Sequence, residues 1–534
     1  NSLKKNENEI LNNYFFFFII LIILEFVSLN FESFLIIDTF HDSVFLTPPI
    51  NYLNNKEFFK STLYDYGFIG NNLGLIFNYL FGFFTLGSIN FIKLILILLI
   101  KFSLVLISKK IIDYLNFDGF YKKLFFILFT FTLLCLPNYY DFASHFSPRS
   151  ILYLFLILLI SSALCIRKFK EIKFFIIGTF SLFSLLWWFD IGIYTNVLLI
   201  VLSIYLIIHS ERRNLFFLLF GLFSSWIIFF ILIPSDEIKD FFYNIKFIIL
   251  TTDYLIGTEY LKPFSEGSTR WTKALLIIFL SSIILINLNF SKKLNINFNL
   301  KIYLNLIFVS GILIFNSALT RSDVYHLKYS SGLYSLIFIF IIYYLLFFYL
   351  TTNKVINAYI LKKNKKIKQN IILTISATLS VLFILGFLNE KNPTTVHQKL
   401  NNLTHFNLNI KKLITTTTKD YLQEKEIMVL ERYNLLSSKD SCVQYFADDN
   451  FFPFFLKKPT CTKFYLSNQI LREFSEEQFI SEFKKTMPNI ILYESPTKLM
   501  FNYDNLQIAM KFVRDNYEFY ENFNGYIFYK RIEN

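Results

Sequence analysis

The chain has 534 residues, of which 54% are hydrophobic and only 17% are charged, and it contains 69 Phe. Soluble domains carry about a quarter of charged residues, so this composition excludes a chain of ordinary soluble domains and indicates a multi-span membrane protein. The formal net charge of +13 comes mainly from Lys and Arg between the apolar runs. Membrane orientation explains such residues, and we expect no nucleic-acid partner.

Apolar runs of roughly 18–24 residues recur up to about Leu388, and each can cross a ~30 Å hydrocarbon core as a helix. The third run is short for a span unless it extends. The spans are expected at residues 14–37, 88–107, 124–136, 151–166, 174–189, 192–208, 215–233, 271–288, 302–319, 329–350 and 371–388.

Lys and Arg fall in every second connection, from Lys4 and Lys5 to Lys365 and Lys366. The positive-inside rule makes those connections and the N-terminus cytoplasmic. With about eleven helices, loop 38–87 and residues 389–534 then lie on the external, periplasmic side. We therefore expect an α-helical polytopic protein of the inner (plasma) membrane, with a transmembrane domain at 1–388 and an external soluble α/β domain at 389–534.

The polar C-terminal part has the alternating pattern of an α/β domain. Strands are expected at 427–430, 442–446, 490–493, near Phe519 and at 526–529, and helices at 476–485 and 506–515. Cys442 and Cys461 lie in this exported part, where an oxidising compartment permits a disulfide. Two free thiols are the alternative.

The first external loop carries the strongest candidate for chemistry. Asp42 follows the first helix and is succeeded by Pro48, Pro49 and the Tyr66-Gly67 turn. A carboxylate at this place faces water and abuts lipid, so it can act as a general base toward an acceptor hydroxyl. The alternative is a solvated helix end.

This loop resembles the first external loop of the type-C (GT-C) glycosyltransferases, in which an Asp or Glu just past helix one is followed by a Pro, a helix and an aromatic-x-Tyr-Gly turn. The chain is similar to the protein-mannosyltransferase and lipid-A aminoarabinose transferase branches. The resemblance implies an enzyme that moves a hexosyl or pentosyl group, with inversion, from a polyprenyl-phosphate sugar to a hydroxyl of a glycan, lipid or protein. His41, Asp65 and Tyr66 then become substrate-binding candidates. The family often has an acidic residue nearer Ser61, and Asp65 is the second carboxylate candidate here.

In relatives, an acidic residue of the second external loop joins the first-loop carboxylate around a metal or an acceptor. Asp141 fits that place, and two carboxylates suit Mg or Mn, so Asp42 and Asp141 are the expected catalytic and metal-binding pair. His145 and Arg149 of the same loop are further substrate-binding candidates. A solvated Asp141 is the alternative.

Residues 320–326 resemble an Arg-x-Asp-x-x-His pattern of some of these transferases, with Arg321, Asp323 and His326 at the three places. An Arg at the membrane surface can clamp a lipid phosphate through paired donors as that phosphate leaves. Arg321 could equally pair with Asp323, and Arg270 and Arg149 are alternative clamps.

Glu25 and Lys101 lie within helices one and two, where an ionisable residue is costly and is usually paired or functional. We expect a structural ion pair rather than a proton pathway. The stretch around 236–250 is amphipathic and is expected in the interface plane, as part of a roof over the substrate.

Two rival functions stay open. A transporter or flippase of lipid-linked saccharides would need polar residues along a path through the membrane, whereas the carboxylates concentrate outside it. A non-catalytic envelope assembly protein would use the C-terminal domain to bind partners. No Gly-rich phosphate loop, zinc-type Cys/His spacing or nucleophile elbow occurs, which argues against nucleotide-driven transport and a soluble sugar-nucleotide enzyme.

Overall fold

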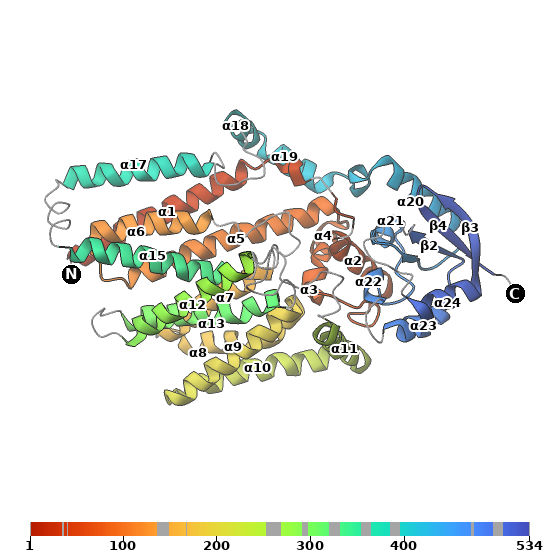
Figure 1. Cartoon of the computed structure of the whole chain (residues 1–534), viewed down its shortest axis with the longest axis horizontal. Helices are drawn as coiled ribbons and strands as arrows, with labels where there is room; N and C mark the ends of the chain where they lie inside the picture. Colours follow the sequence, from red (N-terminus) through yellow and green to blue (C-terminus); the bar gives the residue numbers. More distant parts are fainter. Residues whose placement is uncertain are drawn as a thin grey trace.

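The molecule is a long helical bundle with a smaller α/β domain at one end (Figure 1). The computed structural model describes residues 2–34, 37–39, 41–135, 149–166, 168–251, 269–290, 297–319, 332–353, 365–384, 396–470, 475–494 and 506–532. The N-terminus lies at the end of the bundle that is distant from the α/β domain. The N-terminus and the α/β domain therefore lie at opposite ends of the spans, as the predicted topology requires.

Every predicted span falls on a helix. The bundle helices are α1 (Ser2–Val27), α5 (Leu86–Asp113), α6 (Gly119–Leu134), α7 (Arg149–Cys165), α8 (Lys170–Trp187), α9 (Phe189–Ile208), α10 (Arg212–Leu232), α12 (Thr269–Phe290), α13 (Phe298–Leu319), α15 (Gly332–Thr352) and α17 (Lys365–Ile384). Among the described residues, 6 helices are long and apolar enough to cross a membrane, and shorter apolar helices lie within α1, α7 and α17. The multi-span class is thus confirmed.

Several span boundaries differ from the predicted ones; helix α5, for example, ends at Asp113 rather than at residue 107. Helix α1 ends at Val27 rather than at residue 37, because the Ser28 hydroxyl donates to the Glu25 carbonyl (3.0 Å) and a short 3-10 helix, η1 (Phe31–Phe34), follows. Helix α6 begins earlier than predicted, at Gly119, where the Asp118 carboxylate accepts from the Phe120 N–H (3.3 Å) as an N-cap.

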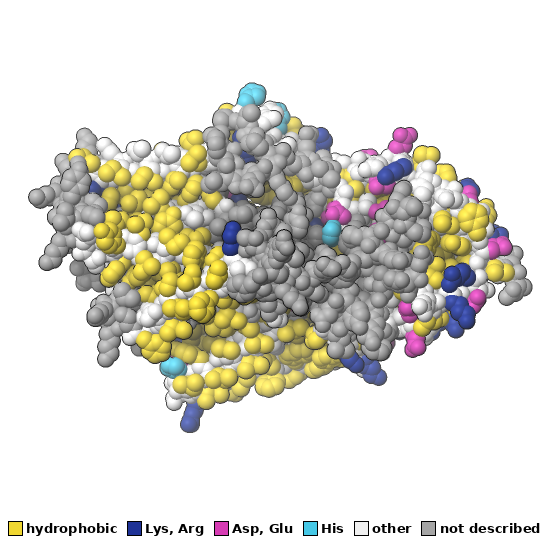
Figure 2. Space-filling model, viewed as in Figure 1, with side chains coloured by type: hydrophobic (Ala, Val, Ile, Leu, Met, Phe, Trp, Pro, Cys, Tyr) yellow, Lys and Arg dark blue, Asp and Glu magenta, His cyan; other side chains and the backbone are white. Residues whose placement is uncertain are grey.

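The spans pack through close contacts and present apolar side chains outward. Helices α8 and α10 approach so closely that a Cβ at Gly178 would lie 2.1 Å from the Leu218 carbonyl oxygen, and one at Gly221 would lie 2.0 Å from the Phe175 oxygen. On the face seen in Figure 2, hydrophobic side chains predominate over the described part of the bundle, whereas most acidic side chains lie on the α/β domain. This division is the one expected of a protein half in lipid and half in water.

The predicted ion pair within the bundle is confirmed. Lys101 of α5 donates to the Glu25 carboxylate of α1, and both side chains are largely buried. A pair in contact neutralises both charges within the spans, which favours the structural interpretation.

Short helices fill the space between the bundle and the α/β domain (Figure 1). The first external loop forms α2 (Ser43–Asn55), α3 (Phe68–Asn71) and α4 (Leu73–Phe81), and α11 (Ser235–Thr251) follows α10. After α17 come α18 (Val396–Thr404) and α19 (Phe406–Thr415). The predicted domain boundary at 388/389 lies outside the described residues.

The α/β domain is a 4-stranded sheet in the order β1-β2-β4-β3, in which β1 pairs parallel to β2 and the other neighbours are antiparallel. Its core includes Phe446, Phe479, Phe483 and Ile491. Its elements are η4 (Thr418–Tyr421), α20 (Glu424–Leu436), β1 (Gln444–Phe446), α21 (Phe452–Leu456), α22 (Ser467–Ile470), α23 (Ser475–Thr486), β2 (Ile490–Glu494), α24 (Gln507–Asn516), β3 (Tyr517–Phe523) and β4 (Tyr526–Arg531).

The predicted strand 427–430 is wrong, because these residues lie in α20. Gln423 and Glu426 form a reciprocal capping box at the start of that helix, and Val429, Leu430 and Tyr433 are buried at helical spacing. A short apolar run fits a strand and a helix equally well, and here the cap decides.

Cys442 and Cys461 form a disulfide. We therefore expect maleimide to modify only Cys135 and Cys165 in denatured, non-reduced protein, and all four cysteines after reduction. Replacing both Cys442 and Cys461 by Ser is expected to lower stability by ~3 kcal/mol, because the bridge closes a short loop of the unfolded chain. Modification of Cys442 or Cys461 before reduction would show that the bridge is absent.

Candidate active site

Asp42 is the N-cap residue of α2, at the outer end of the bundle. Its Oδ2 accepts a hydrogen bond from the Asp38 N–H (2.9 Å), and its Oδ1 lies 3.5 Å from Nζ of Lys93. The side chain of Asp42 is 14% exposed and that of Lys93 is 4% exposed. The carboxylate is thus held between a backbone donor and a buried ammonium rather than being a solvated helix end.

Lys93 belongs to α5, and its ammonium lies 4.1 Å from the centre of the Phe45 ring. An ammonium over an aromatic face gains a cation–π attraction, which adds to the attraction of Asp42. Sequence reasoning did not select Lys93. The signal was present, because Lys93 lies within a predicted span, the same criterion that selected Glu25 and Lys101.

The surroundings of Asp42 suit a base. Burial raises the pKa of the Asp42 carboxyl above its ordinary value, while the Lys93 ammonium and the Asp38 N–H oppose that rise. A carboxylate with a raised pKa binds a proton more strongly than a solvated one, and the lysine charge favours its ionised form. These opposing effects are consistent with a role of Asp42 as a proton acceptor.

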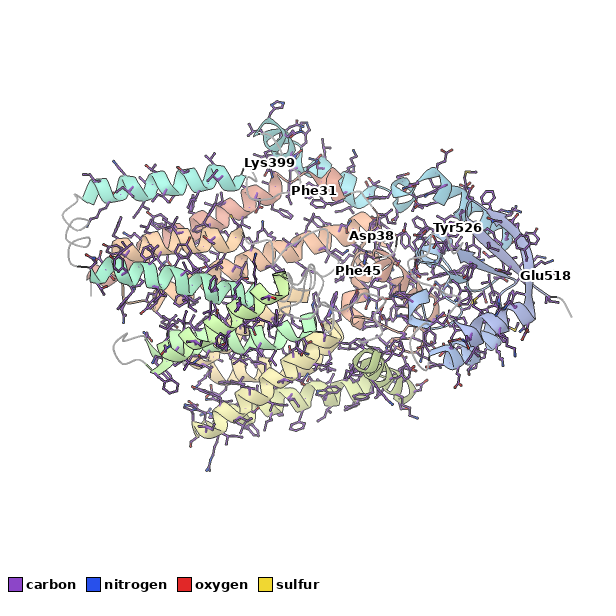
Figure 3. The ribbon with its side chains drawn as sticks, in the orientation of Figure 1. Phe31, Asp38, Phe45, Lys399, Glu518 and Tyr526 are labelled. Carbon is purple, nitrogen blue, oxygen red and sulfur yellow. A yellow bond between two sulfur atoms is a disulfide. The ribbon has the colours of Figure 1, made fainter. Side chains whose placement is uncertain are left out.

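His41 lies beside Asp42 but interacts with Asp38. The Asp38 carboxylate accepts from the His41 N–H (2.9 Å) and lies 2.7 Å from Nδ1 of the His41 ring. Figure 3 shows Asp38 and Phe45 between the ends of the spans and the α/β domain. Asp38, which sequence reasoning did not select, therefore connects His41 and Asp42.

Asp65 and Tyr66 contact other parts of the molecule. Gln469 of α22 donates to the Asp65 carboxylate (3.1 Å), and the Tyr66 ring stacks on Trp188 with a centroid separation of 4.4 Å. A Cβ at Gly67 would lie 2.8 Å from the Trp187 carbonyl oxygen, so the turn requires a residue without a side chain. The Tyr66-Gly67 turn thus packs the loop against the start of α9. A contact of Tyr66 or Asp65 with substrate stays a prediction.

The α/β domain holds α2 in place. The Asn51 side chain donates to Thr460 Oγ1 (2.9 Å) and accepts from the Thr460 N–H (3.0 Å), and the Thr47 hydroxyl donates to the Asn450 carbonyl (2.9 Å). Asn51 and Thr47 are fully buried. Because Cys461 follows Thr460, the disulfide lies directly beside this contact, and the domain positions the helix that begins at Asp42.

Helix α11 contacts the first external loop, and its role as a roof over the substrate stays a prediction. The Glu237 carboxylate accepts from the N–H groups of Phe58 and Phe59, the latter at 2.9 Å. Asp240 of α11 lies 3.4 Å from Nζ of Lys463, which is buried in the α/β domain. The helix therefore joins the loop to the domain.

Glu494 at the end of β2 accepts from the Asp448 N–H (2.9 Å), and burial together with the Asp449 charge raises its pKa from 4.5 to about 7. Between these values the folded protein binds a proton that the unfolded chain releases, so stability falls as pH rises through this window. Glu494→Gln is expected to raise the Tm by a few degrees at about pH 8 and to leave it unchanged at about pH 5.

Glu518→Gln provides the control. It removes a carboxyl from the same sheet, but Glu518 of β3 is exposed, whereas Glu494 is buried (Figure 3). Thermal unfolding of both variants at the two pH values is the measurement. An equal effect of Glu494→Gln at both values would contradict the assignment.

Several predicted site residues lie outside the described residues: Asp141, His145, Arg321, Asp323 and His326. Arg149 and Arg270 stand at the first turns of α7 and α12, and their side chains also lie outside that description. Their roles stay predictions.

The described residues contain no group of three or more His, Cys, Asp or Glu side chains placed to hold a metal ion. Asp42 is paired with the ammonium of Lys93. The other expected ligand, Asp141, lies outside the described residues, so the Mg or Mn site of Asp42 and Asp141 stays a prediction.

Together these features define a multi-span membrane protein with a buried Asp–Lys pair beneath an α/β domain. No family model matches the chain. One curated relative, an undecaprenyl-diphosphatase of Wigglesworthia glossinidia brevipalpis, is 32% identical over 254 residues, which cover 40% of this chain and 90% of the relative. More than half of this chain has no counterpart in it. Membrane helices rich in Phe, Ile and Leu also share identities through composition alone, so we treat this match as a likeness of one part.

Among solved structures, the chain is similar to ArnT from Cupriavidus metallidurans bound to undecaprenyl phosphate. The two share 11% sequence identity and a TM-score of 0.44, over 97% of this chain and 98% of that one. A likeness at that score does not show that the two proteins share an activity.

Proposed function

We propose that the protein is a membrane glycosyltransferase that moves a sugar from a polyprenyl-phosphate donor to an acceptor hydroxyl on the external face. The observation that carries the proposal is the buried Asp42 carboxylate at the outer end of the spans, paired with Lys93. A lipid-linked donor keeps its phosphate at this depth, while the acceptor arrives from water. The resemblance of the first external loop to that of the GT-C glycosyltransferases supports the same function.

The proposed reaction is a single displacement. Asp42 takes the proton of the acceptor hydroxyl while that oxygen forms a bond to the anomeric carbon. The bond between this carbon and the phosphate oxygen breaks, and polyprenyl phosphate leaves with the electron pair, so the configuration inverts. The buried Lys93 ammonium favours the ionised form of Asp42 before this step.

The test is transfer by purified protein from radiolabelled polyprenyl-phosphate sugars. Product bearing the labelled sugar supports the transferase, whereas movement of the lipid-linked sugar across the bilayer without product would identify a flippase. A protein that does neither would fit the assembly function. The identity of the sugar and of the acceptor would follow from the products.

A second candidate is a hydrolase that acts on undecaprenyl diphosphate, which the name of the curated relative favours. Its substrate would occupy the same membrane boundary as a polyprenyl-phosphate sugar. Release of inorganic phosphate from undecaprenyl diphosphate, without sugar transfer, would favour this activity. A transferase would release none.

The topology that the proposal needs is also testable. Cysteine or tag labels after residue 532 are expected to react from the external face, and labels before α1 only from the cytoplasm. The N-terminus and the α/β domain lie at opposite ends of the molecule, which supports this arrangement (Figure 1). Cytoplasmic labelling of the C-terminal tag would move the active face to the wrong side for an external acceptor.

A further inference from the structure

Helices α18 and α19, which we call the α18–α19 hairpin (residues 396–415), lie between the last span and the α/β domain. We propose that this hairpin lies in the headgroup layer of the membrane, with its leucines toward the acyl chains and its lysines toward anionic phospholipid headgroups. The inference does not depend on the proposed transfer activity. It rests on the packing, exposure and charge of the hairpin.

The inner face of the hairpin is fixed to the bundle. Leu413 and Phe406 pack with Phe31 at the outer ends of α1 and α5, and a Cβ at Gly87 would lie 1.8 Å from the Leu413 carbonyl oxygen. The Thr85 hydroxyl donates to the Ile414 carbonyl (2.9 Å). The hairpin therefore has a definite height along the spans.

The outer face of the hairpin exposes large apolar side chains. Leu400 is 56% exposed, Leu403 39% and Leu408 63%. Their neighbours Lys411 and Lys412 are exposed as well. Exposed leucines among polar and basic residues fit a helix that lies in a membrane interface.

The position of the hairpin matches the end of the lipid-facing surface. Helix α1 exposes Phe16, Ile20 and Leu24 along its outer side. One turn beyond Leu24, the carbonyl of Ser28 accepts from the Asn402 side chain of α18 (3.3 Å). The apolar surface of α1 thus continues into the hairpin, and Figure 3 shows Lys399 of α18 beside the end of α1.

The charge of the segment indicates which headgroups it contacts. From Lys391 to Lys419 the sequence contains no Asp or Glu. Lys399 lies on the inner side, where burial lowers its pKa and the Glu25 carboxylate opposes that effect. Lys411 and Lys412 remain on the exposed side, and basic residues at a membrane surface attract anionic lipids.

The test uses the full-length protein in proteoliposomes of phosphatidylcholine, with and without phosphatidylglycerol. A fluorophore is placed at Leu400→Cys or Leu408→Cys in a Cys135→Ser/Cys165→Ser background, which keeps the disulfide. Leu435→Cys of α20, where Leu435 is 64% exposed, is the matched control on the α/β domain. Quenching by a nitroxide lipid is compared with quenching by aqueous iodide.

We expect the nitroxide lipid to quench positions 400 and 408 severalfold more than position 435, and iodide to do the reverse. Lys411→Gln/Lys412→Gln is expected to remove the extra lipid quenching that phosphatidylglycerol produces at position 408. Quenching of positions 400 and 408 by iodide alone would overturn the proposal. Protection from both quenchers would also overturn it, because a protein partner would then cover the face.

Discussion

Asp42→Asn is expected to lower sugar transfer by about 10²–10⁴-fold while donor binding stays largely intact. It leaves the Lys93 ammonium without its carboxylate, so some loss of stability is expected as well. The amide has nearly the same shape, but its single oxygen can replace only one of the two carboxylate oxygens, so it keeps the contact with either the Asp38 N–H or the Lys93 ammonium. It cannot accept the hydroxyl proton, so stabilisation of the transition state is lost more than that of the bound substrate. Steady-state transfer and donor binding by the purified variant are the measurements.

The pH dependence of the wild type provides a second readout. Because burial raises the pKa of Asp42, the acid limb of kcat/KM is expected to fall at a pH above the ordinary value for an Asp side chain. Activity should be present above that pH and be lost as pH falls through it, since only the ionised carboxylate is a base. Asp65→Asn is the control, because Asp65 contacts Gln469 of the α/β domain. Turnover of Asp42→Asn within a few-fold of wild type would remove Asp42 from the mechanism.

The spans could be predicted from the sequence because length and apolarity alone determine whether a helix crosses a bilayer. The loop carboxylate Asp42 could be found as well, since it follows the first helix. Its partner could not be assigned, because the pairing of Asp42 with Lys93 depends on how α2 packs against α5. The contact of Asp65 with Gln469 also joins segments far apart in the chain, so no local pattern encodes it.

Secondary structure in the α/β domain shows the same limit. Strands β2 and β4 and helices α23 and α24 lie close to their predicted ranges, because each has a clear period. Residues 427–430 form no strand, since a capping box and a buried face at helical spacing override a short apolar run. Asp141 and Arg321 came from family resemblance, and their placement relative to Asp42 stays a prediction.

Lys93→Met is expected to impair transfer at neutral pH and to move the acid limb of kcat/KM to higher pH. Methionine keeps the length and the apolar contact with Phe45 but removes the charge that opposes the rise in the pKa of Asp42. More of the carboxyl is then protonated at neutral pH and cannot act as a base. The pH profile of the purified variant is the measurement.

Lys101→Met is the matched control for Lys93→Met. Lys101 lies two turns further along α5, ~12 Å by the helical rise, and pairs with Glu25 outside the candidate site. Each variant removes one partner of a buried pair, which costs about 3–5 kcal/mol of stability. Comparable losses of stability with a shifted acid limb only in Lys93→Met would assign Lys93 to Asp42. Equal profiles would reduce Lys93 to a structural residue.

The double variant Asp42→Asn/Lys93→Met separates stability from catalysis. Because it leaves neither charge alone in the buried site, its stability is expected to recover relative to Lys93→Met, so the two effects on unfolding should not add. Transfer should remain absent, since no base is restored. Recovery of transfer together with stability would show that the Asp42–Lys93 pair only holds α2 against α5, and the proton would then have to go to Asp65 or Asp141.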